Sequence, residues 1–387
     1  MYKKIWGIRK NVFILGLVSF FNDFSSEMVL SVFPAFFTSV LKTGAAALGI
    51  VEGISDFASN IIKIYSGRLS DKTQKRRKLI IVGYILSTLT RPFYALISTA
   101  TGALGLRITD RVGKGLRDAP RDALISLSTD KKELGRAFGY HRAMDTLGGI
   151  LGPLMAFFIL REIPLGFNTV FLWAFIIGLA TIATLFFIKE IRLSLPSNGW
   201  STAKNPLSER FKKYLLSVFL LSVGTLPVAV LLLKAPSAGL EIATIPLFYA
   251  LTNITYSLSS WWAGRMADKR GHRKTLLYGY GCLLLSYLAL FFVDGPGAIA
   301  LGFLLYGLFS GLTDGIHRSY AGKITEEIGR GRTYGWLNGI NGLGLLIAGL
   351  GGGIIWQLWG PAVALIFGVL FILAGLIVFL STQFKNS

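Results

Sequence analysis

Long apolar runs separated by short polar segments make up almost the whole chain. Each run can cross about 30 Å of hydrocarbon at a rise of about 1.5 Å per helical residue. The first run follows a basic start but is too long for a signal peptide and lacks a small-residue cleavage site, so we expect a retained span. The pattern predicts twelve membrane-spanning helices, over residues 12–41, 46–66, 79–99, 103–126, 137–160, 168–188, 214–234, 240–262, 275–293, 298–321, 334–357 and 361–382.

Composition supports an all-α membrane protein. Of 387 residues, 52% are hydrophobic and only 16% are charged, and soluble domains carry more charge than this. The single cysteine, Cys282, excludes a disulfide, and the three histidines lack the spacing of a zinc site. No Ser/His/Asp constellation has workable spacing. We therefore expect neither an enzyme nor a bound metal or cofactor.

The net charge of +20 indicates orientation rather than nucleic-acid binding. Lysines and arginines cluster in alternate loops, which is the positive-inside bias of membrane proteins. This bias predicts that both termini lie in the cytoplasm and that the chain sits in the inner membrane. Anionic lipid explains the basic excess without a nucleic-acid partner.

The chain divides into two similar halves. A polar, Pro- and Ser-containing interval over 191–213 predicts a cytoplasmic linker between two six-helix bundles, 1–190 and 214–387. The segment "GRLSDK" from Gly67 matches "GRMADK" from Gly264, and "GRAFG" from Gly135 matches "GRTYG" from Gly331. Two parallel six-helix repeats around a midplane site are an architecture of many secondary transporters.

These motifs resemble those of the major facilitator superfamily. The Gly-x-Leu-x-Asp-x-basic segment resembles its signature loop, and "RVGKG" at Arg111 resembles its Arg-x-x-x-Gly motif, with Lys114 where glutamine is usual. "GGILGP" at 148–153 resembles the antiporter motif of the drug:proton branch. The resemblance covers the whole chain and implies alternating access, transport of a small molecule and a monomer in the bilayer. It also implies a gating role for the repeated segments and the charges near them, namely Gly67, Arg68, Asp71, Gly264, Arg265, Asp268, Arg121, Asp314 and Arg318.

One predicted span carries an unusual concentration of charge. Residues 105–125 read GLRITDRVGKGLRDAPRDALI, and five charged residues spaced by four, three, four and three form one stripe on a helix: Arg107, Arg111, Lys114, Asp118 and Arg121. A charge facing lipid at mid-bilayer costs about 3 kcal/mol. The stripe is therefore expected to face the interior of the bundle or water.

Other predicted spans of the first half supply matching groups. Burial and a neighbouring arginine act on a carboxylate in opposite directions, so arrival of a substrate can switch its protonation. We expect proton coupling from Asp23, Glu27 and Asp110, with Arg111 as the competing cation. The predicted substrate-binding residues are Asn22, Asp23, Glu52, Asp56, Arg91, Arg107, Arg142, Asp145, Asn338 and Asn341.

Several functions remain open at this stage. The deep arginines favour a proton-coupled carrier of a small organic anion, because guanidinium forks match carboxylate and phosphate. The partial antiporter motif instead favours an exporter of lipophilic cations, or multidrug exporter, coupled to protons. A siderophore or metal-chelate carrier is a third reading. A transport-inactive sensor is disfavoured, because the repeated gating segments are intact and no soluble output domain is present.

Overall fold

The structure, a computed structural model, is almost entirely helical. It describes residues 4–5, 7–130, 133–191, 207–292, 295–324 and 330–381. The first half contains α1 (Lys10–Ser39), α2 (Ala45–Thr73), α3 (Arg76–Phe93), α4 (Ala100–Leu127), α5 (Leu134–Glu162) and α6 (Phe167–Leu185). The rest contains α7 (Glu209–Gly224), α8 (Val228–Leu232), α9 (Lys234–Ser237), the 3-10 turn η2 (Ile242–Thr244), α10 (Ile245–Arg270), α11 (His272–Phe292), α12 (Pro296–Ile324) and α13 (Arg330–Ser381). Before α1, the two-residue strands β1 (Lys4–Ile5) and β2 (Ile8–Arg9) pair antiparallel.

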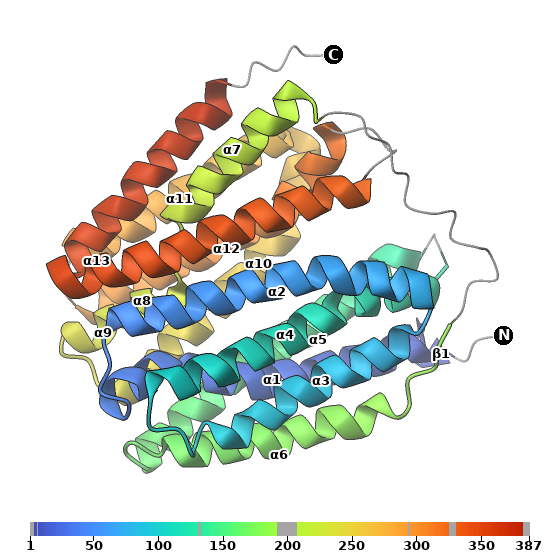
Figure 1. Ribbon diagram of the computed structural model, residues 1–387, viewed down its shortest axis with the longest axis horizontal. Helices are drawn as coiled ribbons and strands as arrows, with labels where there is room; N and C mark the ends of the chain where they lie inside the picture. Colours follow the sequence, from blue (N-terminus) through green and yellow to red (C-terminus); the bar gives the residue numbers. More distant parts are fainter. Residues whose placement is uncertain are drawn as a thin grey trace. The chain divides into compact units, whose positions relative to one another are not determined.

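The predicted set of twelve membrane-length helices is confirmed for the described residues. α7 and α8 together make one span, and α13 makes two because Gly360, at φ 87°, interrupts its helical backbone. The chain reverses direction at that point (Figure 1). Eight of the described helices are long and apolar enough to cross a membrane on those grounds alone. The protein is therefore an integral membrane protein.

The chain forms two compact units that do not follow sequence order throughout. The first contains Met1–Lys42, Ala58–Ser197 and Ile242–Ala250, and the second contains Thr43–Phe57, Asn198–Glu241 and Leu251–Ser387. Helices α2 and α10 are thus each divided between units. The predicted boundaries of the two bundles, 1–190 and 214–387, stay a prediction, and residues 192–206 of the predicted linker lie outside the described residues.

In the first unit, α1 packs against α5 and α6, while α3 packs against α4 (Figure 1). Apolar residues of α1 at helical spacing, Val12, Leu15 and Val18, are fully buried together with Ile80 and Tyr84 of α3. The second unit has its own buried cluster, which joins aromatic residues of α7, α12 and α13. Each unit therefore has an apolar core on which its polar residues can be positioned.

The repeated gating segments lie on helices rather than in loops. We expected a loop from Gly67, but α2 continues to Thr73, and α10 likewise includes Gly264 and Asp268. Each helix ends before a residue with positive φ, Gln74 at 55° in the first repeat and Gly271 at 88° in the second. Such a left-handed residue is a common way to end a helix. The repeat therefore extends to the end of each helix, about two turns beyond the predicted span.

The seventh span is broken, whereas the apolar pattern predicted a continuous helix over 214–234. α7 ends at Gly224 and α8 begins at Val228 after Pro227, which lacks an N–H donor. Tyrosines of neighbouring helices bind the freed backbone groups. The Leu226 N–H donates to Tyr287 Oη (2.8 Å), whose hydroxyl donates to the Gly224 carbonyl (2.9 Å), and Tyr306 donates to the Leu226 carbonyl (3.2 Å). Non-helical backbone at membrane depth is tolerated only with such partners or water.

This arrangement predicts that Tyr287→Phe destabilises the second unit. The substitution removes two hydrogen bonds and leaves a buried backbone N–H unsatisfied, so the free energy of unfolding should fall by about 1–3 kcal/mol. Equilibrium unfolding in mixed micelles measures it. The matched control is Tyr278→Phe on the same helix, where the side chain is 50% exposed and little change is expected. If Tyr287→Phe and Tyr278→Phe were equally stable, the hydrogen bonds of Tyr287 would not stabilise the second unit.

Glycines of α2 and α13 allow these helices to cross closely within the second unit. Gly49 and Gly53 on α2 face Gly349 and Gly353 on α13, and a Cβ at Gly49 would lie 2.9 Å from the Gly353 Cα. The spacing is small-xxx-small on both helices, which favours close backbone approach in membranes. Gln357 closes the end of this contact, because its Oε1 accepts from the Ala46 N–H (3.1 Å) in the first turn of α2. The two helices therefore contact each other through backbone atoms at this crossing.

Candidate functional site

The charged residues of α4 lie on more than one side of the helix. Arg107, Arg117 and Asp118 are buried, with exposed fractions of 2%, 4% and 7%, whereas Lys114 is exposed. The helix begins at Ala100, where the Thr99 side chain accepts from the Gly102 N–H. The predicted stripe is therefore divided into buried members, which have structural contacts, and accessible members.

Arg117 is bound by neutral groups of α3. Its Nη1 donates to Ser87 Oγ (2.6 Å), and its guanidinium lies over the Tyr84 ring at 4.4 Å from the centroid. Ser87 in turn donates to the main-chain carbonyl of Asp110 (3.0 Å). A cation over an aromatic face is attracted by the ring quadrupole. Arg117 therefore fastens α4 to α3 rather than presenting a charge to a solute.

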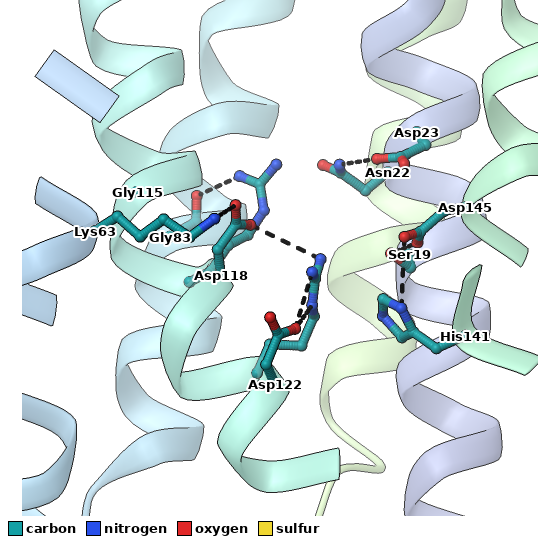
Figure 2. Close-up of polar contacts among 12 residues, drawn as sticks. Ser19, Asn22, Asp23, Lys63, Gly83, Gly115, Asp118, Asp122, His141 and Asp145 are labelled. Atoms are coloured by element: carbon teal, nitrogen blue, oxygen red, sulfur yellow. Dashed lines mark hydrogen bonds and ion pairs between the residues drawn. The ribbon is translucent and has the colours of Figure 1, made fainter. Parts of the chain in front are cut away.

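Asp118 is the centre of a charged cluster that joins α2 and α4. Its carboxylate pairs with Lys63 Nζ at 3.1 Å and with Arg121 Nη1 at 3.8 Å, and Arg121 also pairs with Asp122 at 3.1 Å. Figure 2 shows Lys63 reaching Asp118. The predicted gating residue Arg121 thus lies between two carboxylates of its own helix.

A chain of three residues links Arg91 on α3 to Asp23 on α1. Arg91 Nη2 donates to Asn22 Oδ1 (3.0 Å), and Asn22 Nδ2 donates to Asp23 Oδ1 (2.9 Å; Figure 2). Arg91 and Asn22 are both 2% exposed. We predicted all three as substrate-binding residues. In the structure the Asn22 amide accepts from Arg91 and donates to Asp23, and the substrate-binding role of these three residues stays a prediction.

The other predicted cations of the first unit differ in accessibility. Arg107 is 2% exposed, pairs with Asp110 at 3.6 Å, and lies over Phe33. Arg142 on α5 is exposed, and Arg111 is half-buried. Glu27 accepts a hydrogen bond from Tyr249, which belongs to the first unit through the Ile242–Ala250 segment.

The close crossing of α1 and α5 places a further carboxylate beside α1. Gly148 and Gly152 contact the α1 backbone at Phe20 and Phe24, where a Cβ on Gly152 would lie 2.5 Å from the Phe24 carbonyl oxygen. This is the segment that resembles the antiporter motif. One turn earlier on α5, Asp145 accepts from the Ser19 hydroxyl and lies 3.4 Å from His141 Nδ1 (Figure 2).

The predicted site residues are found in both compact units. The first unit holds Asn22, Asp23, Glu27, Arg91, Arg107, Asp110, Arg111, Arg142 and Asp145, and the second holds Glu52, Asp56, Asn338 and Asn341. Within the second unit, Asn341 Oδ1 accepts from Ser222 Oγ (2.8 Å), and Glu52 is 5% exposed. The groups named for proton coupling all lie in the first unit, and their role stays a prediction.

The predicted gating residues have individual contacts. Asp71 pairs with the buried Arg76 at 3.5 Å, and Gly67 lies 3.5 Å, measured from an added Cβ, from the Ala119 Cβ. In the second repeat, Arg265 stacks on Trp261 at 3.9 Å, and Asp268 is exposed. These residues keep their gating role as a prediction, with Arg76 as an additional basic partner.

The predicted gating residues Asp314 and Arg318 lie one turn apart on α12. Asp314 accepts from the Tyr256 hydroxyl at 3.0 Å, and in the part of the chain that the structure describes no ion pair joins it to Arg318. Beside them, both ring nitrogens of His317 are hydrogen-bonded, Nδ1 to Tyr214 (2.8 Å) and Nε2 to Tyr280 (2.9 Å). We did not single out these two tyrosines, because they lie about 35 to 100 residues from His317 and no local spacing links them.

Twelve helices of membrane length and a set of ionisable side chains inside the first unit define a polytopic membrane transport protein. The chain belongs to the Major Facilitator Superfamily, whose profile matches residues 15–329 and, in a second match, 219–386. The resemblance seen in the sequence motifs is thereby confirmed. The protein is a transporter and not an enzyme.

Relatives support the same family. An uncharacterized MFS-type transporter of Methanocaldococcus jannaschii is 33% identical over 96% of this chain and 94% of its own length. A multi-drug resistance efflux pump PmrA homolog of Lactococcus lactis is 23% identical over 90% of this chain and 88% of its own. Among solved structures, the nucleoside transporter NupG superposes with a TM-score of 0.75 at 13% identity, over 98% of this chain and 100% of that one. This structural similarity shows that the two proteins share a fold.

Proposed function

We propose that this protein is a proton-coupled secondary transporter that moves a small organic anion across the inner membrane by alternating access. The positive-inside distribution of lysines and arginines supports an orientation with both termini in the cytoplasm. Its partners in this proposal are the solute, protons and the bilayer, and it functions as a monomer. Asp23 carries the coupled proton.

The observation that carries the proposal is the accessible cationic charge of α4. Lys114 is exposed and, within the described residues, forms no ion pair. The Lys114 ammonium lies close enough to the carboxylates of Asp23 and Glu27 to interact electrostatically with both. Arg111 lies about one turn earlier on α4. Because Arg91, Arg107 and Arg117 are buried, we propose Lys114 and Arg111 as the anion-binding cations instead.

The overall charge of the network also favours an anion. Six carboxylates stand against eight cationic side chains, which are Lys63, Arg91, Arg107, Arg111, Lys114, Arg117, Arg121 and Arg142. The carboxylates are Asp23, Glu27, Asp110, Asp118, Asp122 and Asp145. Protonation of Asp23 removes a negative charge near Lys114 and increases the cationic excess, so proton and anion favour each other's binding. Coupling of this sign moves both in the same direction.

A pH-sensitive dye inside proteoliposomes tests this proposal. We expect benzoate, succinate or glucose 6-phosphate to drive proton movement in the direction of the anion, and Asp23→Asn to reduce this movement by about 5–150-fold, the usual range of a coupling free energy. Asp130→Asn, at a side chain that is 66% exposed, is the matched control and should transport like the wild type. Unchanged proton movement in Asp23→Asn would exclude Asp23 as the carrier.

A second function, export of lipophilic cations in exchange for protons, is favoured by the named relatives. These include the efflux pump homolog of Lactococcus lactis and the multidrug resistance protein MdtH of Photorhabdus laumondii, 27% identical over 81% of this chain and 77% of its own length. A cation and a proton compete for the Asp23 carboxylate, so they move in opposite directions. Proton movement with tetraphenylphosphonium or ethidium, but with none of the anions, would establish this function and exclude the anion.

A further inference from the structure

A second acid–base pair lies beside Asp23 at the α1–α5 crossing. Asp145 accepts from Ser19 at one carboxylate oxygen, and its other oxygen lies 3.4 Å from His141 Nδ1. Ser19 is fully buried, His141 is 4% exposed, and the Asp145 side chain is 14% exposed. Asp145 is near enough to Asp23 for the two carboxylates to interact electrostatically.

His141 has an unused nitrogen. Its Nε2 is buried and has no hydrogen-bond partner among the described residues. A buried polar atom without a partner costs about 1–3 kcal/mol, which a well-packed structural histidine would avoid. By contrast, both nitrogens of His317 in the second unit are bonded to tyrosines. His141 Nε2 is therefore available to take up a proton.

Charged groups of both signs surround this pair. The α4 helix contributes Arg121, Asp118 and Asp122, α1 contributes Asp23, and α5 itself contributes Arg142. α6, which also contacts α5, has no charged residue. Counted with Asp145, four carboxylates and two guanidinium groups surround His141, so one added proton changes the local charge balance substantially.

Glu27 and Asp23 on α1, followed by Asp145 and His141 on α5, lie progressively closer to the starts of these two parallel helices. Contacts of Gly148 with Phe20 and of Gly152 with Phe24 show that α1 and α5 run in the same direction. At about 1.5 Å per residue from the starts of the helices, Glu27 lies roughly 26 Å along, Asp23 roughly 20 Å, Asp145 roughly 17 Å and His141 roughly 11 Å. Successive groups approach the end at which both helices begin.

We propose that Asp145 and His141 together bind one proton and form a second protonation site between Asp23 and that end of the helices. This proposal rests on the proposed proton coupling at Asp23. Without the proton, the Asp145 carboxylate faces a neutral imidazole whose Nδ1–H points to it. With the proton, the imidazole also carries hydrogen on Nε2, and the pair becomes imidazolium and carboxylate. The proton comes from the Asp23 carboxyl, which is left as a carboxylate.

Asn341 on α13 matches Asp145 in the repeat and also accepts a hydrogen bond from a serine, Ser222 on α7. Ser222 lies at the level of Asp23 rather than of Ser19, because Gly344 contacts Phe219 and Ser222 as Gly148 contacts Phe20 and Asp23. An asparagine at this position is therefore compatible with a hydrogen bond from a serine. Asp145→Asn removes the charge of the first-half residue and keeps an acceptor for Ser19.

NMR of the full-length protein labelled with 15N-histidine, in micelles between pH 5 and 9, tests the site without any solute. Only three histidines are present, and His141→Gln assigns the signal of interest. We expect His141 to titrate, and its midpoint to move by at least about tenfold in proton concentration in Asp145→Asn. Asn341→Asp, the matched control in the other unit, should leave the midpoint unchanged. A His141 signal that never titrates, or that ignores Asp145→Asn, would overturn the proposal.

Transport assays separate this inference from the proposed function. With benzoate, succinate and glucose 6-phosphate, Asp145→Asn should lose at least about tenfold in net proton movement. If the wild type moves protons but Asp145→Asn leaves the titration midpoint of His141 unchanged, the proposed function is supported and the second protonation site is excluded. Coupled titration of His141 without proton movement for any solute would keep the second site and remove the proposed function.

Discussion

Asp118→Asn is expected to lower the free energy of unfolding by about 3 kcal/mol, because it leaves the half-buried Lys63 ammonium without its carboxylate and removes one of the two carboxylates that pair with Arg121. Asp118 pairs with Lys63 at 3.1 Å and Arg121 at 3.8 Å, and its side chain is only 10% exposed. Equilibrium unfolding in mixed micelles measures the loss. Molecules of this variant in which the first unit does not fold should also lose transport activity.

Two further variants give this expectation its controls. Asp122→Asn removes the other carboxylate partner of Arg121, but that side chain is 44% exposed, so a loss below about 1 kcal/mol is expected. Adding Lys63→Met to Asp118→Asn should restore part of the stability, since the double variant no longer buries that unpaired ammonium. Equal losses for Asp118→Asn and Asp122→Asn would show that the buried cluster contributes no more than a surface ion pair.

Gly49→Leu is expected to cost about 3 kcal/mol of stability in the second unit. A side chain there would meet the Gly353 Cα at 2.9 Å and the Gly349 carbonyl even closer, and backbone atoms have no rotamer change with which to withdraw. α2 and α13 would then have to separate, which would also release Gln357 from the first turn of α2. The same unfolding measurement reports the loss.

Gly339→Leu is the matched control for this substitution. Gly339 also lies on α13, but an added Cβ there meets nothing within 4 Å. Leucine is the better helix former, so we expect a change of less than about 1 kcal/mol, in the stabilising direction. Destabilisation of both variants to the same extent would mean that leucine is poorly tolerated anywhere on this helix, and not that the crossing is tight.

Most helices were predictable because their length and hydropathy are sufficient to identify membrane spans, whereas α3, α4 and α10 do not qualify on these grounds alone. The break at Leu226 was not predictable, since the Tyr287 and Tyr306 hydroxyls that make it tolerable lie 60 to 80 residues away in sequence. The extension of α2 and α10 beyond the bilayer was also missed, because charged residues there continue a helix that hydropathy ends. The apolar pattern therefore predicts which residues span the bilayer, and not where each helix ends.

The candidate site was predictable in its composition and only partly in its arrangement. The carboxylates of α1 and the stripe on α4 are visible as charges within apolar runs. Which arginines are accessible is decided by packing partners on other helices, such as Asn22 for Arg91 and Ser87 for Arg117. Ser19 was not predictable in this way, because aligning the two halves on Asp145 and Asn341 places Leu215 opposite Ser19.

The charge of α4 also bears on how the chain is made. A helix with eight charged residues between Arg107 and Asp122 is costly to insert alone, since each central charge adds about 2.5–3.5 kcal/mol on the insertion scale. Its contacts with other helices include Lys63 of α2, which pairs with Asp118, and Ser87 of α3, which accepts from Arg117; both residues are synthesised earlier. We therefore expect α4 to leave the translocon together with α2 and α3, so that assembly of these helices accompanies their entry into the bilayer during translation.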